Sequence, residues 1–475
     1  IKLRCSVQFL GLCFGAMNLY QLLQTRVEME KPVRVALVGA GKFGSMFLAQ
    51  AQRTPGMHVL GVADLSVERA RDALATTGWP AERTDADSAA KALAQGTTLI
   101  TDDAEALITA GGLDVVIEAT GVPEAGICHA LAAIERGCHV VMVNVEADVL
   151  VGPLLAAKAR KAGVVYSLAY GDQPALICEQ VDWARAAGFD IVAAGKGTLY
   201  MPEFHASTPD TVWGHYGLSA AHAEKSGMNA KMFNSFLDGT KSGIEMAAVA
   251  NATGLTPAPG GLTFPPCPVE EIATTLIPKT EGGALHHKGQ VEVISSRSRD
   301  GNDLANDLRW GVYVVFEAAD GYVERCFADY GLITNPSGHY SALWRPYHLI
   351  GLELGISVAS AALRGEATGA PTDFRADVAA TTKRDLKPGD SLDGEGGYTV
   401  WGRLMTAGDS LGFSAVPIGL AHGLTIKKPI SEGNVVTWAD VEIGNDLAAS
   451  VALATRREME ISMTPPSGKN RAKSA

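Results

Sequence analysis

The stretch VRVALVGAGKFGSMFLAQAQR (residues 33–53) decides the fold of this chain. It begins with the apolar run 33–38, which is typical of a buried strand, and passes through a glycine turn into a helical pattern. In the GxGxxG spacing, Gly39 allows a tight turn, Gly41 lets the backbone approach a pyrophosphate, and Gly44 lets the helix pack on the strand. The stretch therefore predicts the first strand–turn–helix unit of a dinucleotide-binding domain.

An acidic residue follows at the position where such domains bind the adenosine ribose. Asp64 lies 25 residues after Gly39, at the end of the second apolar run, 58–65. A carboxylate there accepts from a 2′-hydroxyl and repels a 2′-phosphate, which favours NADH. Arg69 and Arg71 lie close enough to accept a 2′-phosphate, so NADPH stays open.

The segment EATG (118–121) ends the strand that is expected beneath the nicotinamide ribose. Glu118 fits a helix-start carboxylate equally well. The predicted cofactor-binding residues all lie at strand ends or in the turns that follow them: Gly39, Gly41, Lys42, Phe43, Gly44, Asp64, Thr120, Gly121 and Asn144.

The strand–helix alternation continues to about residue 195, which predicts an α/β fold with a Rossmann-type, doubly wound parallel sheet. Its further strands are expected at 114–121, 139–146, 164–169 and 190–195. After residue 200 an α+β central domain is expected, with paired strands at 309–318 and 322–332 and a helix at 346–367 that has Pro346 in its first turn. Short β segments from about 372 to 443 predict a small β-rich module, followed by a last helix near 445–461.

These patterns divide the chain into five parts. Residues 1–30 form an N-terminal extension and helix, in which 1–16 is interpreted as upstream sequence and Met17 as the native start. The others are a dinucleotide-binding domain (31–170), a catalytic and dimerisation domain (171–371), a β-rich module (372–463) and a tail (464–475) that is expected to be disordered.

Composition narrows the classes of function. The 475 residues are 47% hydrophobic and carry a net charge of −12, which argues against nucleic-acid and anionic-membrane partners. The seven cysteines include no CxxC pair, so we do not expect a disulfide framework or a zinc ribbon. This use of cysteine predicts a cytoplasmic protein. The Pro/Gly-rich and β-rich second half suggests a homodimer.

Polar residues at strand ends are the candidates for chemistry. In AYGDQPA (169–175), Asp172 precedes Pro174 and is expected to cap a helix, a role compatible with facing a ligand. Asn144 and Glu146 in VNVEAD are expected to share one face of a strand. Lys196 lies at another strand end, and Glu203 follows it.

Lys241 and Glu245 are four residues apart and thus on one face of a helix. Ser242 and Glu245 also fit the S-x-x-E capping box, which is the structural alternative. The functional alternative is a phosphate or carboxylate site at the helix start, with Glu245 available to a hard cation.

Several motifs together resemble the homoserine dehydrogenase-like oxidoreductases with a C-terminal SAF domain, which include the 1-deoxy-D-xylulose 5-phosphate reductoisomerase-like enzymes. They extend from about residue 17 to 463 and comprise GAGKFG, VADLSVERA, YGDQPAL, AAGKGT, YGLITNPSGHYSALWRPYHLIGLELGIS and KRDLKPGDSLDGEGGYTVWGRL. The resemblance implies NADPH-dependent isomerisation and reduction of a ketose phosphate to 2-C-methyl-D-erythritol 4-phosphate, assisted by Mg²⁺ or Mn²⁺. It also implies catalytic roles for Asp172, Lys196, Lys241 and Glu245, and a metal site of Asp172, Glu203 and Glu245.

The chain departs from the ordinary reductoisomerase pattern at Val145, where that branch has lysine, and GDQP supplies one acid in place of two. The expected partner of the enzyme is a small phosphorylated or hydroxylated substrate. Two other functions stay open. One is a metal-independent dehydrogenase of a hydroxy acid, amino alcohol or sugar acid, and the other is a non-catalytic nucleotide-binding regulator.

Overall fold

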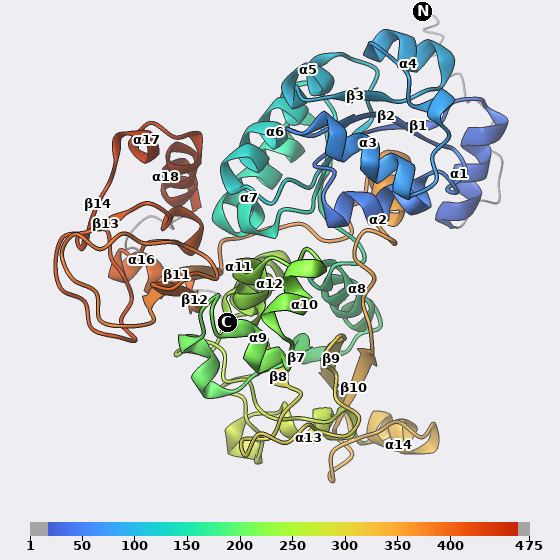
Figure 1. Cartoon of the computed structure of the whole chain (residues 1–475). Coiled ribbons are helices and arrows are strands. Elements are labelled where there is room, and N and C mark those ends of the chain that lie inside the picture. Colours follow the sequence, from blue (N-terminus) through green and yellow to red (C-terminus); the bar gives the residue numbers. More distant parts are fainter. Residues whose placement is uncertain (1–17, 464–475) are drawn as a thin grey trace, which may run out of the picture.

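The computed structural model describes residues 18–463 and arranges them in three parts (Figure 1). A Rossmann-type domain lies at one end, a second α/β domain at the other, and a β-rich module beside both. The predictions made for residues 1–17 and for the tail 464–475 lie outside the described residues. Within 18–463, no helix combines the length and the apolar character needed to span a bilayer.

The predicted doubly wound parallel sheet is confirmed. Its six parallel strands run in the order β3-β2-β1-β4-β5-β6, so the strand order reverses between β1 and β4. Ligands bind at such a reversal, at the carboxyl ends of the strands. The strands are β1 (Val33–Val38), β2 (Met57–Ala63), β3 (Leu99–Thr101), β4 (Val115–Glu118), β5 (His139–Met142) and β6 (Tyr166–Leu168).

Helices cover both faces of this sheet. One face is covered by α5 (Ala104–Thr109), α6 (Pro123–Glu135) and α7 (Val145–Ala162). The other is covered by α2 (Lys42–Ala51), α3 (Val67–Thr76) and α15 (Gly355–Arg364), with α1 (Leu19–Glu28) packed on α15. Helix α4 (Ala89–Gln95) packs beside β2.

Helix α15 shows a difference from the sequence prediction of a helix over 346–367. The helix begins only at Gly355, because Gly351 has a left-handed φ of 69° and a Cβ there would lie 2.6 Å from the carbonyl oxygen of Phe43. The chain thus makes a tight turn against α2 before the helix starts. Although it follows the second domain in sequence, α15 completes the Rossmann domain.

The second sheet has the order β10-β9-β7-β8 and begins with β7 (Asp190–Thr198). The prediction that 190–195 continues the first sheet is therefore wrong: β7 pairs parallel with β8 (Gln290–Ser295) and antiparallel with β9 (Val312–Glu317). The prediction of a strand over 322–332 is also wrong. Asp320 accepts hydrogen bonds from the backbone N–H groups of Tyr322 and Val323 at 2.9 and 3.0 Å, which starts α14 (Gly321–Asp329). The partner of β9 is β10 (Tyr340–Arg345).

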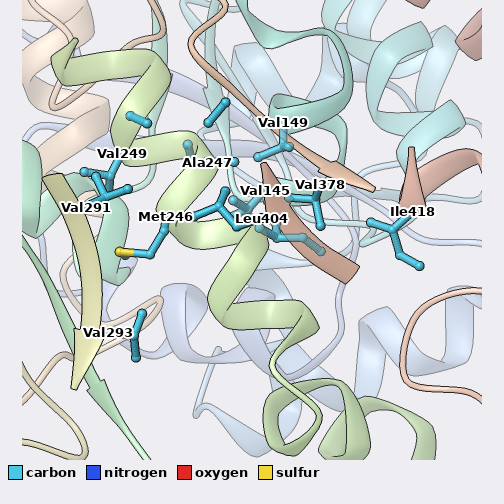
Figure 2. Close-up of a cluster of buried hydrophobic side chains, with 14 of the residues drawn as sticks. Val145, Val149, Met246, Ala247, Val249, Val291, Val293, Val378, Leu404 and Ile418 are labelled. Carbon is cyan, nitrogen blue, oxygen red and sulfur yellow. The ribbon is translucent and has the colours of Figure 1, made fainter. Parts of the chain in front are cut away.

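Helix α12 (Thr240–Thr253) lies near the centre of the molecule (Figure 1), and buried apolar side chains pack around it (Figure 2). Val291 and Val293 of β8 pack on one side of it, and Val378 and Leu404 of the C-terminal module lie on the other. Because this one core includes residues of all three parts, the helix holds them together. The remaining helices of the second domain are α8 (Gln173–Ala186), α9 (Val212–Tyr216), α10 (Ala220–Lys225), α11 (Ala230–Leu237) and α13 (Ile272–Thr275).

The C-terminal module is β-rich, as predicted. It contains two antiparallel pairs. The strands are β11 (Ala376–Thr382), β12 (Val400–Thr406), β13 (Thr425–Ile426) and β14 (Val441–Glu442), and the helices are α16 (Ala407–Phe413), α17 (Asn445–Ala448) and α18 (Val451–Met463). The helix expected near 445–461 is present as two helices, α17 and α18, and α16 was not predicted. Arg456 of α18 forms a buried ion pair with Asp377 of β11 at 2.6 Å and also donates to the carbonyl of Leu150 in α7. The module is thus anchored on the Rossmann domain.

Candidate functional site

The glycine turn between β1 and α2 has the geometry of a pyrophosphate cradle. Gly39 has a φ of 101°, and a Cβ on Gly44 would lie 2.3 Å from the carbonyl oxygen of Gly39. A Cβ on Gly41 would meet no atom within 4 Å, so space remains open at the N-terminus of α2. Since free N–H groups and the helix dipole favour an anion there, this turn fits a dinucleotide. Lys42 is exposed and Phe43 half-buried in the first turn of α2.

Asp64 is held by the protein at the predicted ribose position. Its carboxylate accepts from the backbone N–H groups of Ala40 and Ser66 at 2.8 Å each and from Nε of Arg69 at 3.0 Å. Burial raises the pKa of Asp64, but these hydrogen bonds outweigh burial and lower it. The hydrogen bond from Arg69 contributes most to the lowering. The side chain of Arg69 is 57% exposed, so an anion can approach it beside the Asp64 carboxylate.

The turn after β4 is closed by Glu118, which is fully buried. Oε1 of Glu118 accepts from the hydroxyl and backbone N–H of Thr120 at 2.5 and 3.2 Å, while Oε2 has no hydrogen-bond partner. Thr120 is half-buried and Gly121 exposed. This carboxylate therefore shapes the turn from which the predicted residues Thr120 and Gly121 face the carboxyl edge of the sheet.

Asn144 does not lie on a strand with Glu146, and that prediction is wrong. Strand β5 ends at Met142, and Asn144 caps α7 by accepting from Ala147 N at 3.1 Å. Its Nδ2 donates to the carbonyl of Val122 at 2.9 Å, so Asn144 ties the end of β5 to the turn after β4. Glu146 instead lies in the first turn of α7, at the carboxyl edge of the sheet.

Asp172 caps α8, as predicted, and accepts from the backbone N–H of Gln173 at 2.9 Å. Burial raises the pKa of its carboxyl and the charge of Glu245 raises it further, whereas Lys241 and His348 oppose the shift. Burial and Glu245 therefore favour the protonated carboxyl of Asp172, which lies at the carboxyl end of β6.

Lys196 and Glu245 form a buried ion pair. Lys196 lies on β7 and is 4% exposed, Glu245 lies on α12 and is 3% exposed, and Nζ of Lys196 also donates to Oε1 of Gln173 at 2.9 Å. A buried lysine needs such partners, because an unpaired buried charge is strongly unfavourable. One cluster thus joins the start of α8, the strand β7 and the helix α12.

Lys241 extends this cluster to the Rossmann domain through an ion pair with Glu146. Burial disfavours the lysine's charge, but the carboxylates of Glu146, Glu395, Glu245 and Asp172 outweigh it and raise the pKa of Lys241. The four predicted catalytic residues therefore lie in one charged cluster, together with Glu146, Glu395 and Gln173.

The capping box at Ser242 and Glu245 is not formed. Helix α12 begins at Thr240, after Gly239 with a φ of 91°, so Ser242 already lies inside the first turn. The start is fixed instead by Asp238, which accepts from the backbone N–H of Thr240 at 2.9 Å. This geometry leaves Glu245 free to face Lys196.

The predicted metal site of Asp172, Glu203 and Glu245 does not form. Glu203 is exposed in the 3₁₀ turn Pro202–Ala206, and Glu245 is engaged by Lys196. Throughout residues 18–463, no three His, Cys, Asp or Glu side chains are grouped so as to hold a metal ion. The donor set therefore does not fit the divalent cation that the sequence motifs implied.

One side of the cluster is bordered by the segment 308–311, which the sequence pattern does not reveal. Nε2 of Gln173 donates to the carbonyl of Gly311 at 3.4 Å, and Nδ1 of His348 lies 2.7 Å from the carbonyl of Trp310. Trp310 is 61% exposed, and the guanidinium of Arg309 lies 5.1 Å from its ring centroid. This segment therefore places an exposed tryptophan and a cation beside the buried cluster.

Comparison with known proteins assigns the two larger domains. Residues 39–168 match the family described as homoserine dehydrogenase, NAD binding domain, and residues 171–354 match oxidoreductase DRL, catalytic domain. No curated protein matches the chain. The two matches agree with the cradle at the glycine turn: the first domain is similar to NAD-binding domains and the second to an oxidoreductase catalytic domain.

Similar solved structures include an NAD-binding oxidoreductase from Klebsiella pneumoniae (18% identity, TM-score 0.27, covering 35% of this chain and 43% of that chain). The myo-inositol dehydrogenase from Lactobacillus casei in complex with NAD(H) and myo-inositol has 14% identity and a TM-score of 0.27 over 38% of this chain and 50% of its own. The biliverdin reductase from Synechocystis sp. PCC 6803 has 18% identity and a TM-score of 0.25 over 36% and 48%. The chain thus spans half or less of the length of each.

Proposed function

We propose that this protein is an NAD(P)H-dependent reductase of a small hydroxylated carbonyl compound. The first reaction to test is the conversion of 1-deoxy-D-xylulose 5-phosphate to 2-C-methyl-D-erythritol 4-phosphate. The observation that carries the proposal is the charged cluster at the carboxyl edge of β5 and β6, where Lys241 pairs with Glu146 and Lys196 with Glu245. The resemblance of the sequence motifs to the reductoisomerase-like enzymes with a SAF domain supports the choice of substrate.

The position of the cluster suits hydride chemistry. A bound nicotinamide supplies a hydride to a carbonyl carbon, and the oxygen that becomes an alkoxide needs a proton. Glu146 follows β5, beside the point where the strand order reverses, so Lys241 is held at the edge where the nicotinamide of a dinucleotide lies in this fold. The cluster therefore lies where a donor is needed to protonate the substrate alkoxide.

Lys241 is the proposed proton donor. The carboxylates around it keep its Nζ protonated, so it approaches a carbonyl oxygen as an ammonium ion and stabilises the negative charge that develops there. An alkoxide is far more basic than a lysine amine, so the proton moves from Nζ to the oxygen as the hydride arrives. General acid catalysis of this kind contributes about 10²–10⁴-fold to a rate.

Asp172 and Lys196 are proposed to orient the hydroxyl groups of the substrate. The raised pKa of Asp172 lets its carboxyl donate a hydrogen bond as well as accept one. Glu245 and Gln173 fix the position of Nζ of Lys196, so this lysine is a rigid donor. Rigid donors and acceptors around a polyol exclude water and hold one reactive conformation.

The two lysines are both paired with carboxylates, so they do not suit a phosphate. A cation better placed for it is Arg309 beside the cluster, whose guanidinium lies over the rings of Tyr216 and Trp310. An arginine presents a planar fork of donors that matches phosphate oxygens. A ketose phosphate would then bind its phosphate at Arg309 and place its carbonyl in the cluster, where the carbon skeleton rearranges to an aldehyde before the hydride reduces that aldehyde.

A second candidate is the direct dehydrogenation of a hydroxy acid, amino alcohol or sugar acid without carbon rearrangement. The pairing of Glu245 with Lys196, in place of a three-carboxylate metal site, favours it. The same Lys241 would then take the proton of the hydroxyl group in the oxidative direction.

The test is NADPH oxidation with 1-deoxy-D-xylulose 5-phosphate, with and without Mg²⁺ and with a chelator, and identification of the product by mass spectrometry and NMR. We expect turnover by the full chain, a fall of at least about 100-fold in Lys241→Met, and wild-type turnover in Lys161→Met, an exposed lysine of α7. Absence of turnover by the wild type under all three conditions refutes the ketose phosphate, and turnover of a hydroxy acid or amino alcohol in the chelator establishes the second candidate.

A further inference from the structure

Glu395 reaches the charged cluster from the C-terminal module, far from the other members in sequence. It lies in the turn DGEGGY (393–398) between the strands β11 and β12. With Glu146 and Ile244 it lines a small cavity between α7, α12 and the segment 417–419. The turn therefore carries a second carboxyl group to the pair formed by Lys241 and Glu146.

The turn can take only one conformation. Gly394 and Gly396 have left-handed φ values of 74° and 66°, and a Cβ on Gly396 would lie 2.0 Å from the carbonyl oxygen of Lys231. Nδ2 of Asn234 in α11 donates to the carbonyl of Gly396 at 2.9 Å. Only glycine fits these positions. The turn therefore packs closely against α11, with Glu395 between Gly394 and Gly396.

Further hydrogen bonds hold the ends of this turn. Asp393 accepts from the backbone N–H of Thr399 at 3.1 Å, and its carbonyl accepts from Nζ of Lys231 at 2.5 Å. Nζ of Lys383 donates to the carbonyl of Gly397 at 2.8 Å and pairs with the buried Asp238 at 2.7 Å. A surface turn does not need this much support, whereas a turn that places a functional side chain does.

The charges that face Glu395 come from every element packed against it. Glu146 on α7 and Asp238 after α11 disfavour its ionisation, whereas Lys241 on α12 and a hydrogen bond from Ser235 on α11 favour it. Asp377, which lines the same cavity, is neutralised by Arg456. With burial as the largest cause and Glu146 the next, the pKa of Glu395 is raised to about 7.

We propose that Glu395 is a positioning residue that supplies protons to Lys241. The proposal rests on the proposed function, in which Lys241 loses a proton in each turnover. When Nζ of Lys241 has given its proton to the substrate oxygen, the carboxyl group of Glu395 transfers its proton to the neutral amine. Glu395 is left as a carboxylate and takes a proton from water before the next cycle, so one proton enters from solvent for each hydride delivered.

This relay couples the C-terminal module to the chemistry of the other two domains. A protonated Glu395 also removes one negative charge from beside Lys241, which makes the ammonium a stronger acid. Reduction is therefore fastest where Glu395 is protonated, and it falls as the pH rises through about 7.

The first test uses the full chain without substrate. Infrared difference spectroscopy between acidic and alkaline buffer detects the C=O stretch of protonated carboxyl groups. We expect the wild type to lose such a band as the pH rises through about 7, Glu395→Gln to lack that component, and Glu442→Gln, an exposed acid of the same module, to keep it. Asp148→Asn is the second control, because burial also raises the pKa of Asp148 to about 7.

Persistence of the whole band in Glu395→Gln overturns the proposal. Thermal melting and NADPH binding show whether this variant is folded. If it is not, Ser235→Ala replaces it: loss of the hydroxyl that lowers the pKa of Glu395 must shift the titration of the band to higher pH, and an unshifted titration overturns the proposal.

The second test is the pH profile of kcat for the reduction of 1-deoxy-D-xylulose 5-phosphate. We expect kcat at pH 6 to fall at least about tenfold in Glu395→Gln, the decline near pH 7 to disappear, and Glu395→Asp to restore part of both. A wild-type profile in Glu395→Gln overturns the proposal. Absence of turnover by the wild type refutes only the proposed substrate, since the infrared titration needs none.

Discussion

Two glycines of the turn between β1 and α2 have different neighbours, and substituting each by alanine separates folding from cofactor binding. A Cβ on Gly44 would lie 2.3 Å from the carbonyl oxygen of Gly39 and 3.3 Å from Leu37, whereas a Cβ on Gly41 would meet nothing within 4 Å. Gly44→Ala therefore disturbs the packing of the protein itself. Gly41→Ala fills only the space that the pyrophosphate needs.

The expected magnitudes follow from these distances. In Gly44→Ala the better helix propensity of alanine contributes about 1 kcal/mol, but the clash is with backbone, and overpacking costs about 1–3 kcal/mol or more. A net loss of about 1–2 kcal/mol is expected. In Gly41→Ala the reduced entropy of the unfolded chain, about 0.4–1 kcal/mol, offsets the weaker N-cap, about 0.5–1 kcal/mol, so stability is nearly unchanged.

Thermal melting and fluorescence titration with NADH and NADPH test the pair. Gly41→Ala is expected to melt like the wild type and to bind both cofactors at least about tenfold more weakly, which corresponds to about 1.4 kcal/mol. Gly44→Ala is expected to melt several degrees lower. Wild-type affinity in Gly41→Ala would show that the pyrophosphate does not approach this turn, and wild-type stability in Gly44→Ala would refute the steric argument.

Three further outcomes are expected. Asp172→Asn keeps the cap of α8 and its melting temperature but replaces the carboxyl that orients the substrate by an amide, so kcat/KM is expected to fall about tenfold; unchanged kcat/KM would leave Asp172 a capping residue only. Arg69→Ala removes the exposed side chain beside Asp64 and is expected to weaken NADPH at least about tenfold more than NADH in the same titrations, whereas equal losses would place the 2′-phosphate elsewhere. Arg456→Met leaves Asp377 buried and unpaired and should lower the free energy of unfolding by about 3–5 kcal/mol near neutral pH. Because Arg456 holds the pKa of Asp377 below its ordinary value, that stability is present above pH ~4 and is lost as the pH falls, so denaturation curves of the two proteins should converge in acid.

The elements that local sequence determines were predictable, and those that tertiary contacts determine were not. The strand β1, the glycine turn and the cap at Asp172 depend on residues within one turn of each other, so their patterns are visible in the sequence. Strand β7 has the same apolar pattern as the strands of the first sheet. Only its pairing with β9, more than a hundred residues later, places it in the second one.

The same distinction explains which part of the site the sequence predicts. Lys241 and Glu245 stand out because they share a helical face, but the partner of each lies far away in sequence: Glu146 in α7 of the Rossmann domain and Lys196 in β7. The sequence suggested a phosphate or carboxylate site at Lys241 because nothing local shows that a carboxylate of another domain already pairs with this lysine. Because a carboxylate balances the charge of each lysine, the cluster suits a neutral polyol better than a phosphate.

The turn that carries Glu395 shows what signal could have found the missing member. DGEGGY places a single acid between glycines that adopt left-handed conformations, and such a run is costly in conformational entropy unless a defined geometry is needed. An exposed loop has no need of Gly396 within contact of α11, or of a lysine and an asparagine holding its carbonyls. The glycine-flanked acid is thus the feature of the β-rich module that links it to catalysis. The module then has a role beyond covering α12, because it brings a proton-carrying group to a lysine that the other two domains position.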